Sequence, residues 1–176
     1  DTMKLTPRIV RLLSLSLLLV LLLTSLAPAA LADLDKPGRL KTMSGVVQVW
    51  WIIETPQGLR GAGAGSGTII SPDGLVLTNH HVAVPDDSQV KHLGIALTTR
   101  TDRPPQPAYI ATVVADDPYL DLSVLRISHE LDLQPVQTGD LNLPFVPLGN
   151  SDDLDVGDEL NIFGFPGIGG DTLTFT

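Results

Sequence analysis

Two adjacent histidines, His80 and His81, stand in the segment VLTNHHVA (residues 76–83) of a chain that has four histidines. Histidine takes up and releases a proton near neutral pH, so either residue is a candidate general base. Successive residues of a strand point to opposite faces, so both cannot serve one site if a strand continues through them. The alternative for a lone histidine among apolar residues is a hydrogen-bonded structural role.

Asp121 is the acid that stands directly at the start of the apolar segment LSVLRI (residues 122–127). A carboxylate among apolar residues is costly unless it has a partner, and histidine is a natural one. An aspartate that accepts from one ring nitrogen fixes the tautomer, so the other nitrogen can take a proton from a serine hydroxyl. This chemistry is the reason to consider His81 together with Asp121, although their spacing alone does not establish the pair. Asp116 and Asp117 precede Pro118 in a turn-like context, and we predict that they are solvated.

The remaining candidate motifs favour structural interpretations. The run GAGAGSG (residues 61–67) lacks the glycine order of a dinucleotide-binding loop and the lysine of a P-loop. Ser66 does not fit a nucleophile elbow, because Ala64 stands two positions before it and no helical pattern follows. We interpret the run as a glycine-rich strand where backbones approach closely. The acidic residues between 152 and 159 lack the ligand spacing of a calcium loop and predict a solvated turn.

The sequence predicts no metal site. Two metal ligands on one strand would stand at positions i and i+2, and no other cluster of histidines and carboxylates offers matching spacing. The absence of cysteine excludes a cysteine-ligated metal, a disulfide framework and a cysteine nucleophile.

Short β-rich segments separated by turns must position these residues. Alternating and apolar runs predict six strands, at residues 46–54, 62–70, 75–78, 95–99, 109–115 and 122–127. A Ser-Pro-Asp-Gly turn follows the second of them. Residues 101–108 contain three prolines, which lack the donor that a strand ladder needs. This spacing, without a convincing amphipathic helix, indicates a small antiparallel barrel or sandwich. The apolar run at residues 159–165 is expected to open a second sheet.

Residues 1–32 have the layout of a secretory signal peptide: a basic start, an apolar stretch and a small-residue exit. We expect cleavage after Ala32, and therefore an exported protein in the periplasm or outside the cell. The alternative is an uncleaved leader that anchors the protein to a membrane, but the apolar stretch is short for a membrane span. Without the leader we expect no stable membrane insertion.

The charge balance disfavours nucleic acid and anionic lipid as partners. The formal net charge is −9, and without residues 1–32 it becomes −11, from 8 basic and 19 acidic residues. A chain this acidic repels phosphate-rich surfaces. We interpret the charges as a source of solubility.

Three segments together resemble the HtrA/Deg branch of the trypsin-like serine proteases. They are GSGTIISPDGLVLTNHHV, ADDPYLDLSVLRI and LGNSDDLDVGDELNIFGFPG, and the resemblance extends over about residues 44–176. It implies two perpendicular six-stranded β-barrels with the active site between them. It also implies that His81 is the general base, that Asp121 orients it, that His80 has no catalytic part, and that neither a metal nor an organic cofactor is needed.

The chain departs from the family pattern at the nucleophile. It contains no Gly-Asn-Ser-Gly-Gly segment, and Asp152 and Asp153 follow Gly149-Asn150-Ser151. We do not assign Ser151 as the nucleophile, because the family has a structural turn at this place. We expect the sequence to be part of a longer protein whose nucleophilic serine lies beyond Thr176, and these 176 residues to be inactive alone.

We therefore predict an all-β fold, a trypsin-like double β-barrel whose first barrel is complete and whose second is truncated. The expected parts are a signal peptide (1–32), a flexible lead-in (33–43), the first barrel (44–140), and a linker with the start of the second barrel (141–176). The predicted function is a serine endopeptidase that cleaves unfolded or misfolded polypeptides in an exported compartment, and a homo-oligomer is among the states left open. The alternative is a non-catalytic peptide-binding protein on the same scaffold, and an exported structural β module is a third, weaker interpretation.

Overall fold

The computed structural model describes residues 35–166 and 172–176. The predicted signal peptide, residues 1–32, lies outside these ranges. The described residues form a closed six-stranded barrel and a small two-stranded sheet. In chain order the elements are α2 (Lys36–Gly45), β1 (Val46–Thr55), β2 (Gly58–Ile69), β3 (Leu75–Thr78), α3 (His80–Ala83), β4 (Val90–Leu97), β5 (Gln106–Asp117), β6 (Leu122–Glu130), two 3-10 turns (Thr138–Asp140 and Ser151–Asp153), β7 (Phe163–Gly164) and β8 (Thr174–Phe175).

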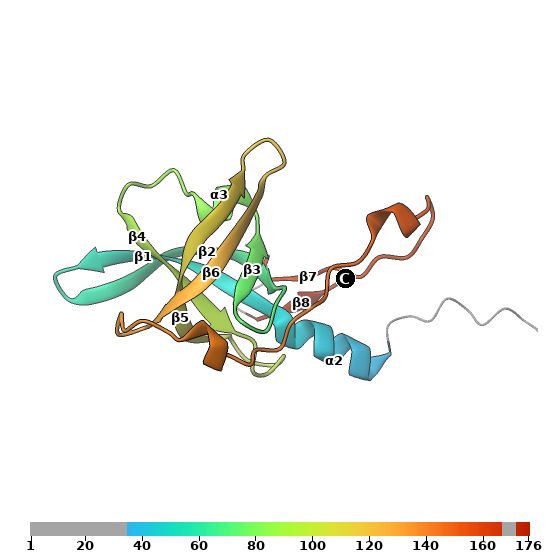
Figure 1. Cartoon of the computed structure of the whole chain (residues 1–176), viewed down its shortest axis with the longest axis horizontal. Helices are drawn as coiled ribbons and strands as arrows, with labels where there is room; N and C mark the ends of the chain where they lie inside the picture. The colour runs from blue at the N-terminus through green and yellow to red at the C-terminus, as the bar shows by residue number, and fades with distance from the viewer. Residues whose placement is uncertain (1–34, 167–171) are drawn as a thin grey trace, which may run out of the picture. The chain divides into compact units, whose positions relative to one another are not determined.

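The six long strands close into a ring in which every neighbouring pair is antiparallel. Their order is β1–β2–β3–β6–β5–β4, and β4 closes the ring onto β1. Figure 1 shows these strands wrapped around one interior, with β7 and β8 near the C-terminal end of the chain. Apart from Ser123, the largest fully buried side chains are aliphatic and fill the ring: Val47, Val49, Ile69, Val76, Ile95, Leu125 and Ile127. The six predicted strands are confirmed, and closure of the ring decides for the barrel over the sandwich.

Alternating glycines of β2 allow neighbouring groups to approach the strand. A Cβ atom at Gly65 would lie 2.5 Å from Cγ2 of Val82, and one at Gly63 would lie 2.4 Å from Cε3 of Trp51. A side chain at either position would force its neighbour to shift. The interpretation of GAGAGSG as a strand is confirmed, but the groups that approach these two glycines are side chains and not backbones. Gly65 is therefore the place where α3, through Val82, rests on the barrel wall.

The second sheet consists of two short strands, β7 and β8. It is shorter than predicted, because β7 covers only Phe163–Gly164 of the apolar run 159–165. The Phe163 and Phe175 rings stack with their centroids 5.0 Å apart. Phe165 and Leu173 are buried with Val46 of the first strand. The Phe165 backbone N–H donates to the Ser66 hydroxyl at 2.8 Å, so β2 of the barrel is tied directly to this sheet.

The backbone differs from the sequence-based expectation at two further places. A helix, α2, occupies Lys36–Gly45, where a flexible lead-in was expected over 33–43. The Asp35 carboxylate caps this helix by accepting from the Gly38 N–H at 2.8 Å, and Pro37 stands in its first turn, where a missing N–H is tolerated. The fifth strand begins inside the proline-rich segment, with Pro107 opposite Ala96 at a register irregularity. Among the described residues, no helix is long and apolar enough to cross a membrane.

Candidate active site

A change from strand to helix separates β3 from the two histidines. β3 ends at Thr78, and α3 begins at His80. The N–H groups of Val82 and Ala83 donate to the Asn79 carbonyl at 3.2 and 3.0 Å, which closes the first helical turn. The rule that adjacent strand residues face opposite sides therefore does not apply here, and both imidazoles reach carboxylates of the β5–β6 region.

His81 and Asp121 are brought together across the barrel end. His81 Nδ1 lies 2.8 Å from Asp121 Oδ2 and 3.0 Å from Oδ1. The His81 backbone N–H also donates to Asp121 Oδ1 at 3.0 Å. The Asn79 side-chain amide donates to the Asp121 backbone carbonyl at 3.0 Å and to Oδ2 at 3.2 Å. Asp121 thus accepts from both the backbone and the ring of one histidine, which fixes the orientation of that ring.

Asp121 is more exposed than the sequence suggested. Its side chain is 45% exposed and that of His81 is 67% exposed, so the expectation of a carboxylate embedded among apolar residues is wrong. The reason is its place at the barrel rim, directly before β6, where its backbone adopts a left-handed φ of 52°. Hydrogen bonding accounts for its stabilisation: the His81 backbone N–H, then the His81 ring and the Asn79 amide, lower the pKa of the Asp121 carboxyl, while desolvation opposes them.

The second histidine has a carboxylate partner of its own. His80 Nδ1 lies 2.8 Å from Asp116 Oδ1 and 3.0 Å from Oδ2. The Ser123 hydroxyl donates to the same Asp116 oxygen. The Ser123 hydroxyl and then the His80 ring lower the pKa of the Asp116 carboxyl, against desolvation. The prediction that Asp116 is merely solvated is therefore wrong, because strand pairing places Ser123 directly opposite it.

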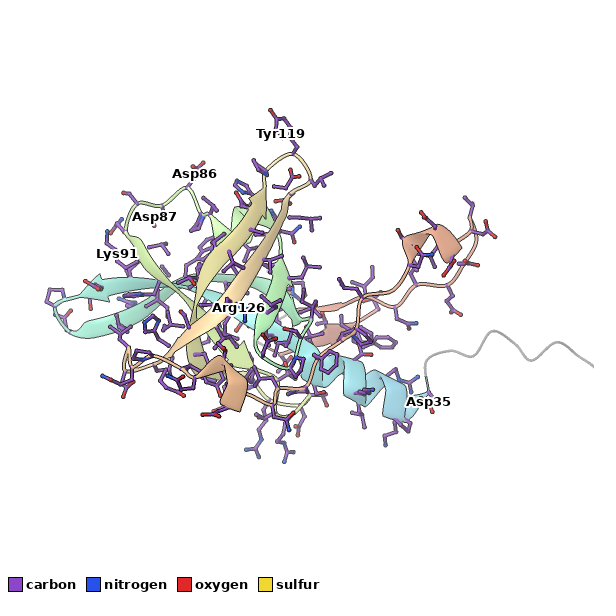
Figure 2. All side chains as sticks on the ribbon, viewed as in Figure 1. Asp35, Asp86, Asp87, Lys91, Tyr119 and Arg126 are labelled. Atoms are coloured by element: carbon purple, nitrogen blue, oxygen red, sulfur yellow. The ribbon has the colours of Figure 1, made fainter. Side chains whose placement is uncertain are left out.

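An open cavity of about 570 Å³ lies beside His81. Trp51, Val84 and Pro85 give it apolar walls, and Asp86 and Asp87 contribute acidic groups. Figure 2 shows both aspartates on the loop that connects α3 to β4. The Trp51 indole N–H donates to the Val82 carbonyl at 2.8 Å, which holds this wall against α3. The cavity can take an apolar or basic side chain next to the candidate base.

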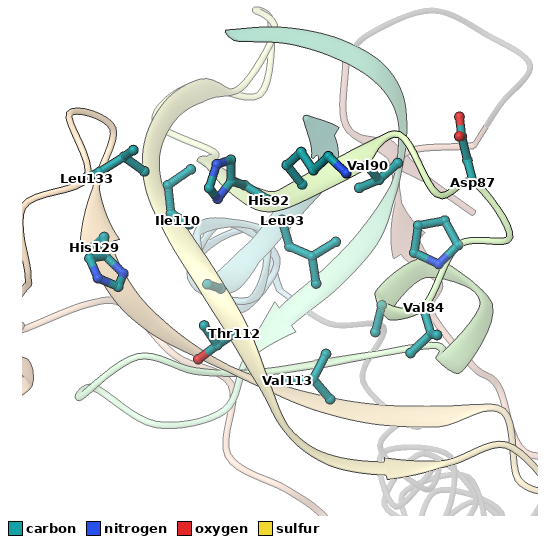
Figure 3. Close-up of a pocket in the computed structure, with 14 residues that line it drawn as sticks. Val84, Asp87, Val90, His92, Leu93, Ile110, Thr112, Val113, His129 and Leu133 are labelled. Atoms are coloured by element: carbon teal, nitrogen blue, oxygen red, sulfur yellow. The ribbon is translucent and has the colours of Figure 1, made fainter. Parts of the chain in front are cut away.

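A second cavity of about 570 Å³ shares Val84, Pro85 and Asp87 with the first and is otherwise lined mainly by β4 and β5 residues and by His129 (Figure 3). It contains neither His81 nor Asp121. His92 and His129 are its two histidines. Within the described residues, no group of three or more histidine, cysteine, aspartate or glutamate side chains is arranged to hold a metal ion.

None of the serines in the described part of the chain is hydrogen-bonded to a ring nitrogen of His81. Ser66 accepts from Phe165, as noted above, and Ser151 begins an exposed 3-10 turn capped by Asn150. Within residues 35–166 and 172–176, no group forms a hydrogen bond with His81 Nε2. The site therefore holds an oriented imidazole whose second nitrogen is available for proton transfer.

A six-stranded antiparallel barrel that holds an aspartate-oriented histidine at its end is typical of chymotrypsin-like hydrolases. Residues 65–176 match the model of the family described as trypsin-like peptidase domain. The match covers more than half of the chain, and the chain belongs to this family.

The most informative relatives are bacterial proteases. The chain is 36% identical over 113 residues to a "Probable periplasmic serine endoprotease DegP-like" of Chlamydia pneumoniae, an alignment that covers 64% of this chain and 19% of the relative. A protein of the same name from Rickettsia prowazekii is 35% identical over 115 residues, covering 65% of this chain and 18% of that protein. "Serine protease PepD" of Mycobacterium tuberculosis is 33% identical over 143 residues, covering 81% of this chain and 28% of PepD. The chain thus spans only 18–28% of the length of these relatives.

Proposed function

We propose that this chain belongs to a serine endopeptidase and supplies its general base and orienting carboxylate. The observation that carries the proposal is the double contact of one histidine with one carboxylate: His81 Nδ1 at 2.8 Å and His81 N–H at 3.0 Å from Asp121. This contact keeps the proton on Nδ1, so Nε2 is free to accept one.

The proposed reaction is acyl transfer from a peptide to a serine. A serine in a part of the protein beyond Thr176 attacks the scissile carbonyl, and His81 Nε2 takes up the hydroxyl proton. The carbon–nitrogen bond then breaks, and His81 gives this proton to the departing amine. Water repeats the sequence to release the acyl group, and the Asp121 carboxylate stabilises the imidazolium that forms in each half of the reaction.

The proposed substrates are unfolded or misfolded polypeptides in an exported compartment. The cavity beside His81 is open to solvent, so an extended polypeptide can place a side chain against its apolar walls and acidic groups. This accessibility supports an unfolded substrate. The printed names of the DegP-like relatives support a periplasmic location. We further propose that β7 and β8 begin the second barrel of a trypsin-like double barrel, and that the complete protein can assemble with copies of itself.

Hydrolysis of an unfolded protein by the full-length protein tests this function. Three matched variants each remove one imidazole: His81→Ala at the proposed base, His80→Ala at its neighbour, and His129→Ala on β6. We expect His81→Ala to lower kcat by about 10⁴-fold or more, since triad members act as one unit. His80→Ala should cost far less, and His129→Ala should leave the rate almost unchanged.

Labelling by a fluorophosphonate separates the two functions that the fold allows. A serine nucleophile activated by His81 reacts with this probe in the wild type and loses its reactivity in His81→Ala. Equal rates for His80→Ala and His81→Ala would contradict the assignment of the base. Binding of unfolded peptides without hydrolysis or labelling would support the non-catalytic alternative instead.

A further inference from the structure

Two of the three carboxylates at the β5–β6 hairpin end each hold one of the two histidines. Asp116 is near the end of β5, and Asp121 directly precedes β6. The turn between them is itself fixed, because the Asp117 carboxylate accepts from the Tyr119 and Leu120 N–H groups at 3.0 and 3.1 Å. Figure 2 shows Tyr119 at the tip of this turn, away from the barrel. The two carboxylates are therefore presented from one rigid hairpin end.

The opposing element, α3, has little stability of its own. It is four residues long, and the Asn79 side chain does not cap it. A helix this short is not stable without tertiary contacts. Its attachment to the hairpin includes the two imidazole–carboxylate contacts, each with a shortest distance of 2.8 Å, and the bonds that the His81 N–H and the Asn79 amide donate to Asp121. On the barrel side, the Trp51 indole and the packing of Val82 on Gly65 hold it.

Ser123 fixes the second carboxylate from inside the barrel wall. Its side chain is buried, with the residue only 1% exposed, and it lies opposite both Thr78 of β3 and Asp116 of β5. Its hydroxyl donates to Asp116, which in turn contacts His80. This order, serine to aspartate to histidine, does not form a second catalytic triad, because the hydroxyl is bonded to the carboxylate and not to the imidazole.

We propose that His80, Asp116 and Ser123 form a positioning clamp that holds α3 at the hairpin and so keeps His81 in register with Asp121. His80 also lines the cavity beside His81, but the clamp contacts none of the reacting atoms and acts through the placement of His81. The inference rests on the proposed role of His81. It gives a function to a residue for which the family resemblance implies none.

Kinetics of the full-length protein test the clamp. His80→Ala should lower kcat about 10-fold with KM almost unchanged, a smaller loss than the roughly 10²-fold cost of a 1 Å misplacement of reacting groups. His80→Asn restores a donor close to the position of Nδ1 and should recover most of that loss. Ser123→Ala, which leaves both rings intact, should give a smaller loss of about 3-fold because one supporting hydrogen bond is removed.

The matched controls lie on the same strand. His129→Ala and Ser128→Ala remove a histidine–serine contact of 2.9 Å on β6 outside the clamp, and we expect wild-type kcat for both. All assays are made well below the melting temperature of each variant, so that lost stability does not appear as lost rate. Wild-type kcat for His80→Ala, or no recovery in His80→Asn, would overturn the clamp.

A readout without turnover separates failure of the clamp from failure of the proposed function. The nitrogen-15 NMR shift of His81 Nδ1 in the full-length protein reports its hydrogen bond to Asp121. In His80→Ala this shift should move toward that of a free imidazole, and in His129→Ala it should not move. An unchanged shift in His80→Ala refutes the clamp, whereas full activity of His81→Ala refutes the proposed function whatever the shift shows.

Discussion

Replacement of Asp121 by asparagine is the sharpest test of how the site fixes the imidazole. The carboxylate accepts hydrogen bonds from three donors: the His81 backbone N–H, the His81 ring and the Asn79 amide. An asparagine side chain keeps one acceptor oxygen and presents an NH₂ group in place of the other. If the oxygen stays on the backbone N–H, the NH₂ group faces Nδ1, which must then become an acceptor.

The proton of His81 is consequently moved to Nε2, the nitrogen that accepts the serine proton in the proposed reaction. We expect Asp121→Asn to lower kcat by about 10⁴-fold with little change in KM, the effect of a triad aspartate whose loss selects the wrong tautomer. The assay is hydrolysis of a peptide reporter by the full-length protein, compared with Asp140→Asn on an exposed turn of the same barrel. A kcat within 10-fold of the wild type would refute the argument that Asp121 sets the tautomer.

Gly65→Ala should destabilise the barrel by about 1–3 kcal/mol, because its Cβ would lie 2.5 Å from Val82 Cγ2 in a well-packed wall; urea unfolding measures this loss. The pKa of Asp73 is lowered by the Ser71 hydroxyl and then by Arg126, below its ordinary value of 3.8. Its ionised form therefore contributes stability above about pH 4 that is lost as the pH falls through the lowered pKa. Asp73→Asn should reduce the free energy of unfolding at pH 7, and this loss should become smaller as the pH falls below about 4, so a loss of equal size at every pH would contradict this linkage.

The barrel could be predicted from the sequence because local patterns of apolar and turn residues indicate its strands. Runs such as VVQVWWIIE and LSVLRI are short, apolar and bounded by turn residues, and each became a strand within a few residues of its expected limits. The helix α2 was missed because its signal is a single cap, Asp35, ahead of a segment with proline and glycine in its first turn. Apart from the Asp35 cap, the composition of this segment is typical of a loop.

The site could be predicted only in part, for a different reason. His81 and Asp121 were paired from the chemistry of their types and from family resemblance. Local patterns predict a solvated Asp116, because its partners depend on strand register, which such patterns do not encode: Ser123 lies opposite it, and His80 reaches it from another element. The burial argument for Asp121 failed as well, because an acid next to an apolar strand can lie at the rim of a barrel.

Ring order explains why the two histidines and the two carboxylates must meet. β3 and β6 are far apart in the sequence but adjacent in the ring, and Thr78 at the end of β3 pairs with Ser123 at the start of β6. Residues that follow β3 and residues that precede β6 are therefore brought to the same end of the barrel. The contact of His81 with Asp121 is a consequence of this pairing, with α3 supplying the turn that the histidine needs. Any change that shifts the β3–β6 register by one residue would move Asp121 away from His81, even though both residues were retained.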